Sequence, residues 1–422
     1  MLKINLRAGG RACSSPLQHS DLLCYTNRSS SVAAMTVSLS TQPSQEERLF
    51  TSRGLRPPHF ESYKPPKEIK GGHHRASVRC LGWSTDARRL ASGGTDKTVK
   101  VWTPERSLAE RSSVELKGHT ETVDALAWDP THPERVATAS SDKTVRVWDI
   151  RSQVATMTTA TPGSNINLSF HPKGHLIAVG DREDVVSLLD VRAGGKILGV
   201  IRPSDSSSSS SHEEINEINW NNSGSIFAAT TGTGYVRVLD ARSHNDCEAP
   251  KVASESASAK VGNGERDSAA GGDTKAAAAT KSMSKGSETI PWNPIHTLIA
   301  HTATIFCAQF DPLGRYLATA SADSTIGCWN IPEFTSHWMS GSELNYPPRS
   351  LSFSHDGEFI AAGGEDPFVW IGSTVDGSTI HKITTSGMTI NSLAWNPSKY
   401  LLAYAGEEKV AGHEGTIRIW GL

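Results

Sequence analysis

A histidine, a serine or threonine, an aspartate and a tryptophan recur together three times along this chain, and side chains of these types could carry out chemistry. Tryptophan can only donate hydrogen bonds and aspartate can only accept them, whereas histidine and the hydroxyls can do both. The four side chains of each set can therefore satisfy one another inside a folded unit. Because a buried group left without a partner costs ~1–3 kcal/mol, we interpret the sets as networks that stabilise the fold. They are His74, Ser92, Asp96 and Trp102; His119, Thr138, Asp142 and Trp148; and His301, Thr319, Asp323 and Trp329.

The segments that carry these residues repeat. Residues 90–102 return as residues 136–148, a step of 46, and again as residues 317–329. A period of about 40–50 residues is typical of proteins built from stacked copies of one supersecondary unit. In the second copy, β-branched and aromatic side chains alternate along residues 144–148 after a short turn at 141–143, which predicts a hairpin. The unit shows no helical period, so we expect it to be all-β.

Four weaker copies complete the pattern. Each is anchored on an aromatic residue at the end of a predicted inner strand, namely Phe170, Trp220, Phe353 and Trp395. Without about 70 N-terminal residues and the 46 residues from 244 to 289, the chain has about 44 residues per copy, which suits this kind of repeat. The sequence therefore predicts an all-β fold, a seven-bladed WD-repeat β-propeller.

The predicted boundaries follow from composition and from the repeats. Residues 1–50 are expected to form a disordered N-terminal tail, residues 51–66 a basic approach segment, and residues 67–422 the propeller. Residues 244–289, rich in alanine, serine, glycine, lysine and glutamate, are expected to be a disordered low-complexity insert between blades four and five. Because the last blade lacks a fourth strand, residues 67–70 are predicted to supply its outermost strand and to close the ring.

Composition and motifs argue against several classes of function. A net charge of −2 provides no overall positive field that would attract nucleic acid. The six cysteines lack the spacing of zinc ligands, and residues 93–98 fail as a phosphate-binding loop because their lysine lies in a hairpin turn. No apolar run is long enough to span a membrane. We therefore expect no enzymatic activity, no catalytic, metal-binding or cofactor-binding residues, no cofactor, no small-molecule substrate and no membrane association.

The segments that look least like generic repeats carry a family resemblance. The most specific is Asn-Glu-Ile-Asn-Trp-Asn-Asn at residues 216–222. Together they resemble the WD-repeat subunit 3 family of the THO complex, over roughly residues 68–422 apart from the insert. The resemblance implies a nuclear, non-enzymatic scaffold in the transcription-export complex, which couples transcription to mRNA packaging and nuclear mRNA export. It also implies that the other THO complex subunits are partners and that contact with the mRNA ribonucleoprotein is indirect. The segments are residues 166–170, 177–186, 215–222, 310–316 and 349–357.

One alternative is a substrate receptor of a cullin-type ubiquitin ligase. Trp148, Asp149 and Arg151 resemble the Trp-Asp-x-Arg box of such receptors, although the same letters are common in WD blades that lack this role. Weaker echoes occur at residues 189–192 and 239–242.

A second alternative is a reader of peptides or histone tails. Loops on the top face of a propeller would present Arg75, Glu121, Arg182 and Glu365, a set of mixed charge without an aromatic cage. The sequence leaves open whether the top face, the bottom face or the rim docks partners.

Overall fold

Seven four-stranded antiparallel sheets make up nearly all the regular structure of the described residues. The structure is a computed structural model, and it describes residues 58–69, 73–105, 113–202, 213–242, 290, 292, 294–341, 343–408 and 415–421. From the innermost to the outermost strand, the sheets are β2-β3-β4-β5, β6-β7-β8-β9, β10-β11-β12-β13, β14-β15-β16-β17, β18-β19-β20-β21, β22-β23-β24-β25 and β26-β27-β28-β1.

The strands are short, as expected for runs of β-branched and aromatic residues separated by tight turns. Blades one to four consist of β2 (Val78–Trp83), β3 (Leu90–Gly94), β4 (Val99–Trp102), β5 (Val114–Leu116), β6 (Val123–Trp128), β7 (Arg135–Ser140), β8 (Thr144–Asp149), β9 (Val154–Ala160), β10 (Asn165–Phe170), β11 (Leu176–Asp181), β12 (Val186–Asp190), β13 (Lys196–Ile201), β14 (Ile215–Trp220), β15 (Ile226–Thr231), β16 (Tyr235–Asp240) and β17 (Pro294–Ile299). Blades five to seven consist of β18 (Ile305–Phe310), β19 (Tyr316–Ser321), β20 (Ile326–Asn330), β21 (Thr335–Ser340), β22 (Pro348–Phe353), β23 (Phe359–Gly364), β24 (Phe368–Ser373), β25 (Thr379–Thr384), β26 (Thr389–Trp395), β27 (Leu402–Glu407), β28 (Ile417–Trp420) and β1 (Lys67–Glu68).

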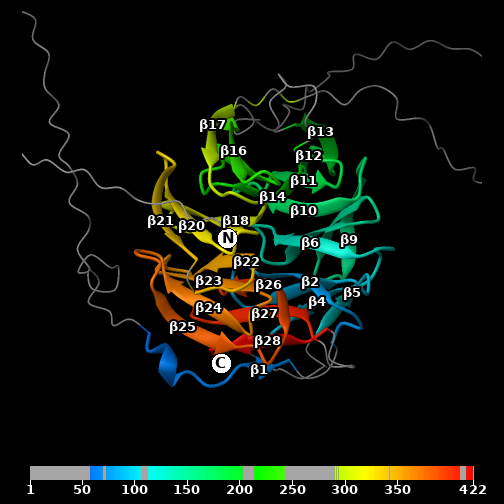
Figure 1. The fold of residues 1–422 in the computed structure, drawn as a ribbon. Helices are drawn as coiled ribbons and strands as arrows, with labels where there is room; N and C mark the ends of the chain where they lie inside the picture. Colours follow the sequence, from blue (N-terminus) through cyan, green and yellow to red (C-terminus); the bar gives the residue numbers. More distant parts are fainter. Residues whose placement is uncertain are drawn as a thin grey trace, which may run out of the picture. The chain divides into compact units, whose positions relative to one another are not determined.

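The sheets follow one another around a ring, with the first strand of each blade innermost. β2 contacts β6 on one side and β26 on the other, and the same relation continues through β10, β14, β18 and β22 (Figure 1). This arrangement confirms the predicted seven-bladed β-propeller.

The core lies between neighbouring blades. Between blades one and two, Val99 and Val101 are buried against Val123 and Trp148. Both faces of a blade are covered in this way, so strands such as β3, β11 and β23 are buried along their whole length. Burying one such aliphatic side chain contributes ~1.5–3 kcal/mol, which explains why blades that lack the polar set still fold.

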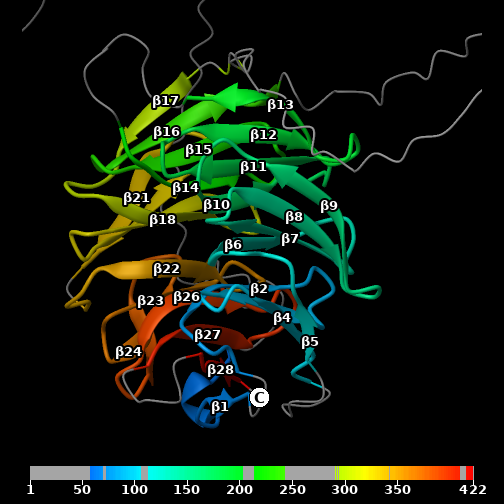
Figure 2. The same cartoon turned by 90° about the vertical axis from the view of Figure 1, so that its right-hand side faces the viewer.

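The ring is closed by the strand that the sequence predicts. β1 pairs antiparallel with β28, with Lys67 opposite Ile419 and Glu68 opposite Arg418 (Figure 2). The Ile69 N–H donates to the carbonyl of Ile417 at 3.0 Å, which continues the pairing past β1. The last blade therefore has four strands, and closure by an N-terminal strand is confirmed.

An aromatic residue ahead of β1 is also anchored. Phe60 lies in the 3₁₀ turn η2 (Phe60–Ser62), is 3% exposed, and packs among Phe359, Trp395 and Trp420. Its ring centroid lies 4.9 Å from that of Phe359 and 5.3 Å from that of Trp420. The described part of the approach segment, residues 58–66, is thus held against blades six and seven.

The insert occupies a different place from the one expected. The strands on either side of it, β16 and β17, are hydrogen-bonded neighbours in one sheet. The insert therefore divides blade four between its third and fourth strands and does not separate blades four and five. The reason is that each sequence repeat begins with the outer strand of the preceding blade, so repeats and blades are offset by one strand. The predicted disorder of residues 1–50 and 244–289 concerns segments outside the described residues.

Turn geometry explains why glycine recurs four residues after the aromatic anchor. In four blades this residue has a positive φ, which glycine adopts without a steric penalty. In blade one the same turn contains Ala87, with φ +64°, instead of glycine. The four glycines are Gly174, Gly224, Gly314 and Gly357, with φ between +70° and +75°.

Every inner strand contains a β-bulge near its first residue. In each blade the pairing between the first two strands skips one residue, which lies four positions before the aromatic anchor. A bulge leaves its extra residue out of the ladder and re-aims its side chain. The seven bulged residues are Arg79, Asp124, Ile166, Asn216, Phe306, Arg349 and Asn391.

Candidate functional site

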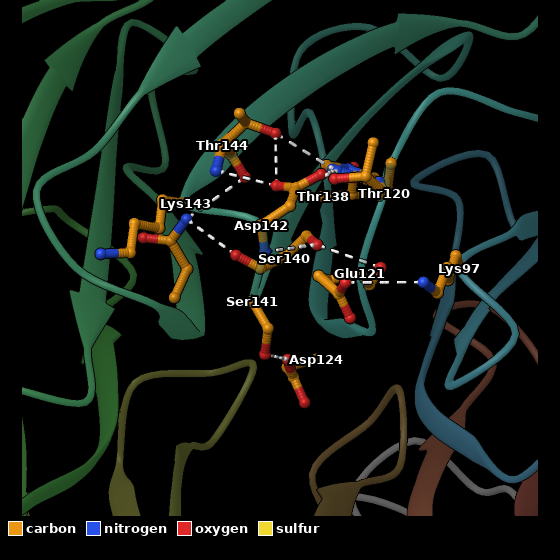
Figure 3. Close-up of polar contacts among 12 residues, drawn as sticks. Lys97, Thr120, Glu121, Asp124, Thr138, Ser140, Ser141, Asp142, Lys143 and Thr144 are labelled. Carbon is orange, nitrogen blue, oxygen red and sulfur yellow. Dashed lines mark hydrogen bonds and ion pairs between the residues drawn. The ribbon is translucent and has the colours of Figure 1, made fainter.

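The polar set of blade two forms a continuous chain of hydrogen bonds. Trp148 Nε1–H donates to Thr138 Oγ1 at 2.8 Å, and Thr138 Oγ1 lies 2.8 Å from His119 Nε2. His119 Nδ1 lies 2.9 Å from Asp142 Oδ2. Asp142 also accepts hydrogen bonds from the loops before β6 and at the start of β8, as Figure 3 shows for Thr120 and Thr144.

Blade one repeats this geometry. His74 Nδ1 lies 2.9 Å from Asp96 Oδ1, and His74 Nε2 lies 2.7 Å from Ser92 Oγ, which accepts the Trp102 Nε1–H at 3.2 Å.

Blade five repeats it as well. His301 lies 3.1 Å from Asp323 and 2.8 Å from Thr319, and the Trp329 Nε1–H donates to Thr319 Oγ1 at 2.9 Å.

The direction of each hydrogen bond in the network follows from which groups can donate and which can accept. Tryptophan donates to the hydroxyl, the hydroxyl donates to Nε2, and Nδ1–H donates to the carboxylate. Burial lowers the pKa of His119 and of His301, which favours this neutral imidazole. Burial alone would raise the pKa of Asp142, but hydrogen bonds from Thr144, Thr120 and His119 lower it to about 2.

These networks are closed to substrate. In blade one the order of hydroxyl, imidazole and carboxylate is that of a serine hydrolase. However, Ser92 and His74 are buried, and the Ser92 hydroxyl already accepts the Trp102 N–H. A substrate carbonyl has no access to this oxygen, so the arrangement can stabilise the blade but cannot attack a substrate.

The residues of the proposed adaptor box occupy a turn. Trp148 is buried, and Asp149 Oδ1 accepts the Arg151 N–H at 2.8 Å. The Arg151 side chain is 81% exposed, with its guanidinium 3.7 Å from Glu134. The two echoes of the box make the same contact, since Asp190 and Asp240 each accept the N–H two residues ahead, at 2.9 and 3.0 Å. Turn geometry thus accounts for the aspartate of the recurring Asp-x-Arg.

The four predicted top-face residues are not all brought together. The Arg75 N–H donates to Asp96 Oδ2 at 2.9 Å, and Glu121 lies 3.5 Å from Lys97 (Figure 3). Glu365 pairs with Arg349. Arg182 lines a cavity that Arg349 also lines, whereas Arg75 and Glu121 do not.

That cavity is the mouth of the central channel. Its volume is about 370 Å³, and its walls consist of the Arg182 side chain and six of the seven bulged residues: Arg79, Asp124, Ile166, Phe306, Arg349 and Asn391. An adjoining pocket of about 450 Å³ shares Arg79, Asp124 and Arg182 and extends past hydroxyl side chains to Glu407.

Most of these wall residues were not predicted from the sequence. A signal for them does exist, because each bulged residue stands four positions before the aromatic that ends its inner strand. When the seven repeats are aligned on that aromatic, the position four residues before it contains all seven bulged residues.

Two further ionisable groups lie on the inner strands. Burial raises the pKa of Glu217 on β14 to about 8. Burial also raises the pKa of the Cys307 thiol on β18, and the charge of Glu217 adds to this shift.

Among the described residues, no group of histidine, cysteine, aspartate and glutamate side chains is arranged to hold a metal ion. Within the same residues no long apolar helix of the kind that crosses a lipid bilayer is present.

Comparison with known proteins agrees with this architecture. The model of the WD domain, G-beta repeat, matches five segments of the chain. Blades three and four, in which Leu189 and Leu239 replace the tryptophan, lie largely outside the matches. The matched segments are residues 64–103, 110–149, 292–330, 335–371 and 377–421.

A solved structure and two curated proteins are similar over most of the chain. The β-propeller domain of Cps50 (Swd1) from Myceliophteria thermophila shares the fold, with a TM-score of 0.66 at 18% identity over 85% of this chain and 99% of that one. The WD repeat-containing protein AAC3 of Dictyostelium discoideum is 28% identical over 81% of this chain and 64% of its own length. THO complex subunit 3 of Arabidopsis thaliana is 35% identical over 84% of this chain and 95% of its own length. The chain therefore belongs to the THO complex subunit 3 family of WD-repeat β-propellers.

Proposed function

We propose that this protein is a non-enzymatic scaffold subunit of the THO complex, that it acts in the nucleus, and that it helps couple transcription to mRNA packaging and nuclear mRNA export. The observation that carries the proposal is the 35% identity to the Arabidopsis subunit, which extends over 95% of that protein. Similarity over nearly the whole length of that protein supports a shared role as well as a shared fold.

The geometry supports a scaffold. The hydroxyl, imidazole and carboxylate groups that could have formed a catalytic centre are buried within the blades and satisfied there. Closure of the ring by β1 leaves no open seam between the first and last blades. A rigid plate of this kind can hold partner subunits in fixed positions without reacting with them.

Contact with RNA is proposed to be indirect or limited to the approach segment and its surroundings. There, six basic residues stand against Glu61 and Glu68: Arg53, Arg56, Lys64, Lys67, Lys70 and Arg75. The purified protein should bind single-stranded RNA weakly, and added salt should abolish the binding.

Affinity purification of the tagged chain from nuclear extract, followed by mass spectrometry, tests the scaffold proposal. We expect the other THO complex subunits in near-equal amounts, at salt concentrations that abolish RNA binding, because specific interfaces depend mainly on buried anchors and shape. A chain that lacks residues 244–289 should recover the same subunits. Absence of these subunits from the full-length sample would refute the proposal.

The ligase alternative makes a different prediction in the same experiment. A substrate receptor should co-purify with the ligase adaptor, and Arg151→Ala should abolish that association. Because Arg151 is exposed and only loosely paired, the substitution should leave the recovery of THO subunits unchanged.

A further inference from the structure

We propose that the mouth of the central channel binds a phosphorylated serine or threonine in a peptide segment of a partner protein. This function goes beyond the scaffold role and does not depend on it. It rests on how the fold assembles the mouth, on the charge gathered there and on the shape of the cavity.

The fold builds the site from one position of the repeat. A bulge in each inner strand takes one residue out of the ladder, and six of the seven bulged residues line the cavity. Because blades six, seven and one are neighbours, Arg349, Asn391 and Arg79 form a continuous arc on one side of the mouth. Rigid inner strands hold this arc in place, so a ligand meets groups that are already positioned.

The charge of the mouth favours an anion. Three arginines line it, from blades one, three and six, together with the carboxylate of Asp124, and Glu365 pairs with Arg349 from outside the lining, which leaves an excess of one positive charge. The protein as a whole carries a charge of −2, so this excess is local. A planar guanidinium can give two parallel hydrogen bonds to a phosphate, and clustered arginines are the usual means of recognising phosphorylated side chains.

The three arginines differ in their ion-pair and hydrogen-bond partners. Arg182 has no ion-pair partner among the described residues and is exposed. Arg79 Nε is 3.7 Å from Asp124, which also accepts the Ser141 hydroxyl at 2.6 Å (Figure 3). Arg349 is oriented by Glu365 and by Asn391, whose amide is held by the carbonyl of Val78 at 3.1 Å. The mouth therefore offers one unpaired guanidinium and two whose positions are fixed.

The shape of the mouth and the charges around it together favour a peptide over RNA as the ligand. Phe306, 37% exposed, and Ile166 line the mouth from blades five and three, outside the arc, and offer apolar surface on which the residue next to the phosphate can pack. The hydroxyl-lined pocket beside the mouth, which ends at Glu407, can hold the following residues of an extended segment. A polynucleotide would bring several phosphates close together, and the carboxylates of Asp124, Glu365 and Glu407 would repel them.

Fluorescence polarisation with three labelled probes tests the proposal. The probes are a peptide pool with a central phosphothreonine flanked by mixed residues, the same pool without phosphate, and a 5′-phosphorylated single-stranded RNA. We expect saturable binding of the phosphorylated pool alone, with inorganic phosphate as a competitor. Because a charge-assisted hydrogen bond contributes ~1.5–3 kcal/mol, Arg182→Gln and Arg349→Gln should each weaken binding about tenfold or more.

Matched variants separate the mouth from general charge effects. Arg88→Gln removes an exposed arginine from the loop at the opposite end of β2 and should leave binding unchanged. Asp124→Asn should tighten binding, because it removes the carboxylate and keeps an acceptor for Ser141. Thermal unfolding of each variant checks that the fold is intact.

Three results would overturn the proposal. The first is equal binding of the two peptide pools, or no saturable binding of either. The second is binding of the phosphorylated pool that survives both arginine substitutions in folded protein. The third is binding of the RNA, but not of the peptide, that is lost in the same variants, which would assign the mouth to nucleic acid.

Discussion

Replacement of Asp142 by alanine provides a direct test of the network in blade two. The carboxylate accepts four hydrogen bonds: from His119 Nδ1 at 2.9 Å, from the Thr120 N–H at 3.0 Å, and from the Thr144 N–H and hydroxyl at 2.9 and 2.6 Å. Asp142→Ala removes the common acceptor and leaves four donors to find others.

The expected cost depends on which donors can reach water. The Thr120 N–H is exposed, and the Thr144 hydroxyl can rotate, so both can be solvated. The His119 side chain is only 1% exposed, and the Thr144 N–H is partly buried. With ~1–3 kcal/mol for each buried donor that loses its partner, the free energy of unfolding should fall by about 3 kcal/mol.

Urea unfolding followed by tryptophan fluorescence measures this loss. The midpoint should fall while the slope against urea stays the same, since the surface exposed on unfolding does not change. Asp149→Ala is the matched control, because Asp149 lies in the same blade and accepts an N–H in an exposed turn. Its cost should be about 0.5–1 kcal/mol. Equal losses for the two variants would show that the buried network stabilises the blade no more than a hydrogen bond in an exposed turn does.

The pH dependence provides a second measurement on the same variant. The pKa of Asp142 is about 2 in the folded protein, below its usual value of 3.8. A carboxyl whose pKa is lowered by folding contributes stability above its unfolded pKa and loses it as pH falls toward the folded value. The parent protein should therefore lose stability more steeply than Asp142→Ala between about pH 4 and pH 2.

The remaining predictions concern other parts of the fold. A chain that begins at residue 71 should aggregate in size-exclusion chromatography because β28 loses its partner, whereas a chain that begins at residue 51 should remain monodisperse; equal behaviour would mean that β1 is dispensable. Phe60→Ala should lower the free energy of unfolding by ~3–5 kcal/mol, and an unchanged urea midpoint would contradict the anchoring of this ring. Because burial raises the pKa of Glu217 to about 8, the folded state keeps its proton to higher pH than the unfolded state does, and stability should fall as pH rises to about 8. Glu217→Gln should reduce this fall in urea titrations at several pH values. Ala87→Gly should raise the melting temperature slightly, because residue 87 has a positive φ that is strained for alanine but not for glycine.

The sequence predicts the parts of this fold that depend on residue type and spacing. The sets around His119 and His301 could be recognised because donors and acceptors match within each set, and their distances agree with that matching. The pairing of β1 with β28 could be predicted because the last repeat had three strands in a fold whose blades have four.

The sequence did not predict the parts that depend on register and on three-dimensional convergence. Arg79 and Arg349 lie 270 residues apart and meet only because the ring closes. Their position is a bulge, where the two-residue alternation that reveals strands breaks down. Phe60 lies ahead of the first repeat, so no periodicity marked it as buried.

The closing strand also has a consequence for how the protein is made. Glu68 pairs with Arg418, so its partner is translated 350 residues later. At about 5–20 residues per second, the ribosome needs roughly 20–70 seconds to cover that interval. During this time β1 is a free strand with an unpaired edge, and the blades that emerge behind it stack into an open arc. The ring therefore cannot close until β28 has left the ribosome, and until then the newly made chain is exposed to chaperones and to pairing with other nascent chains.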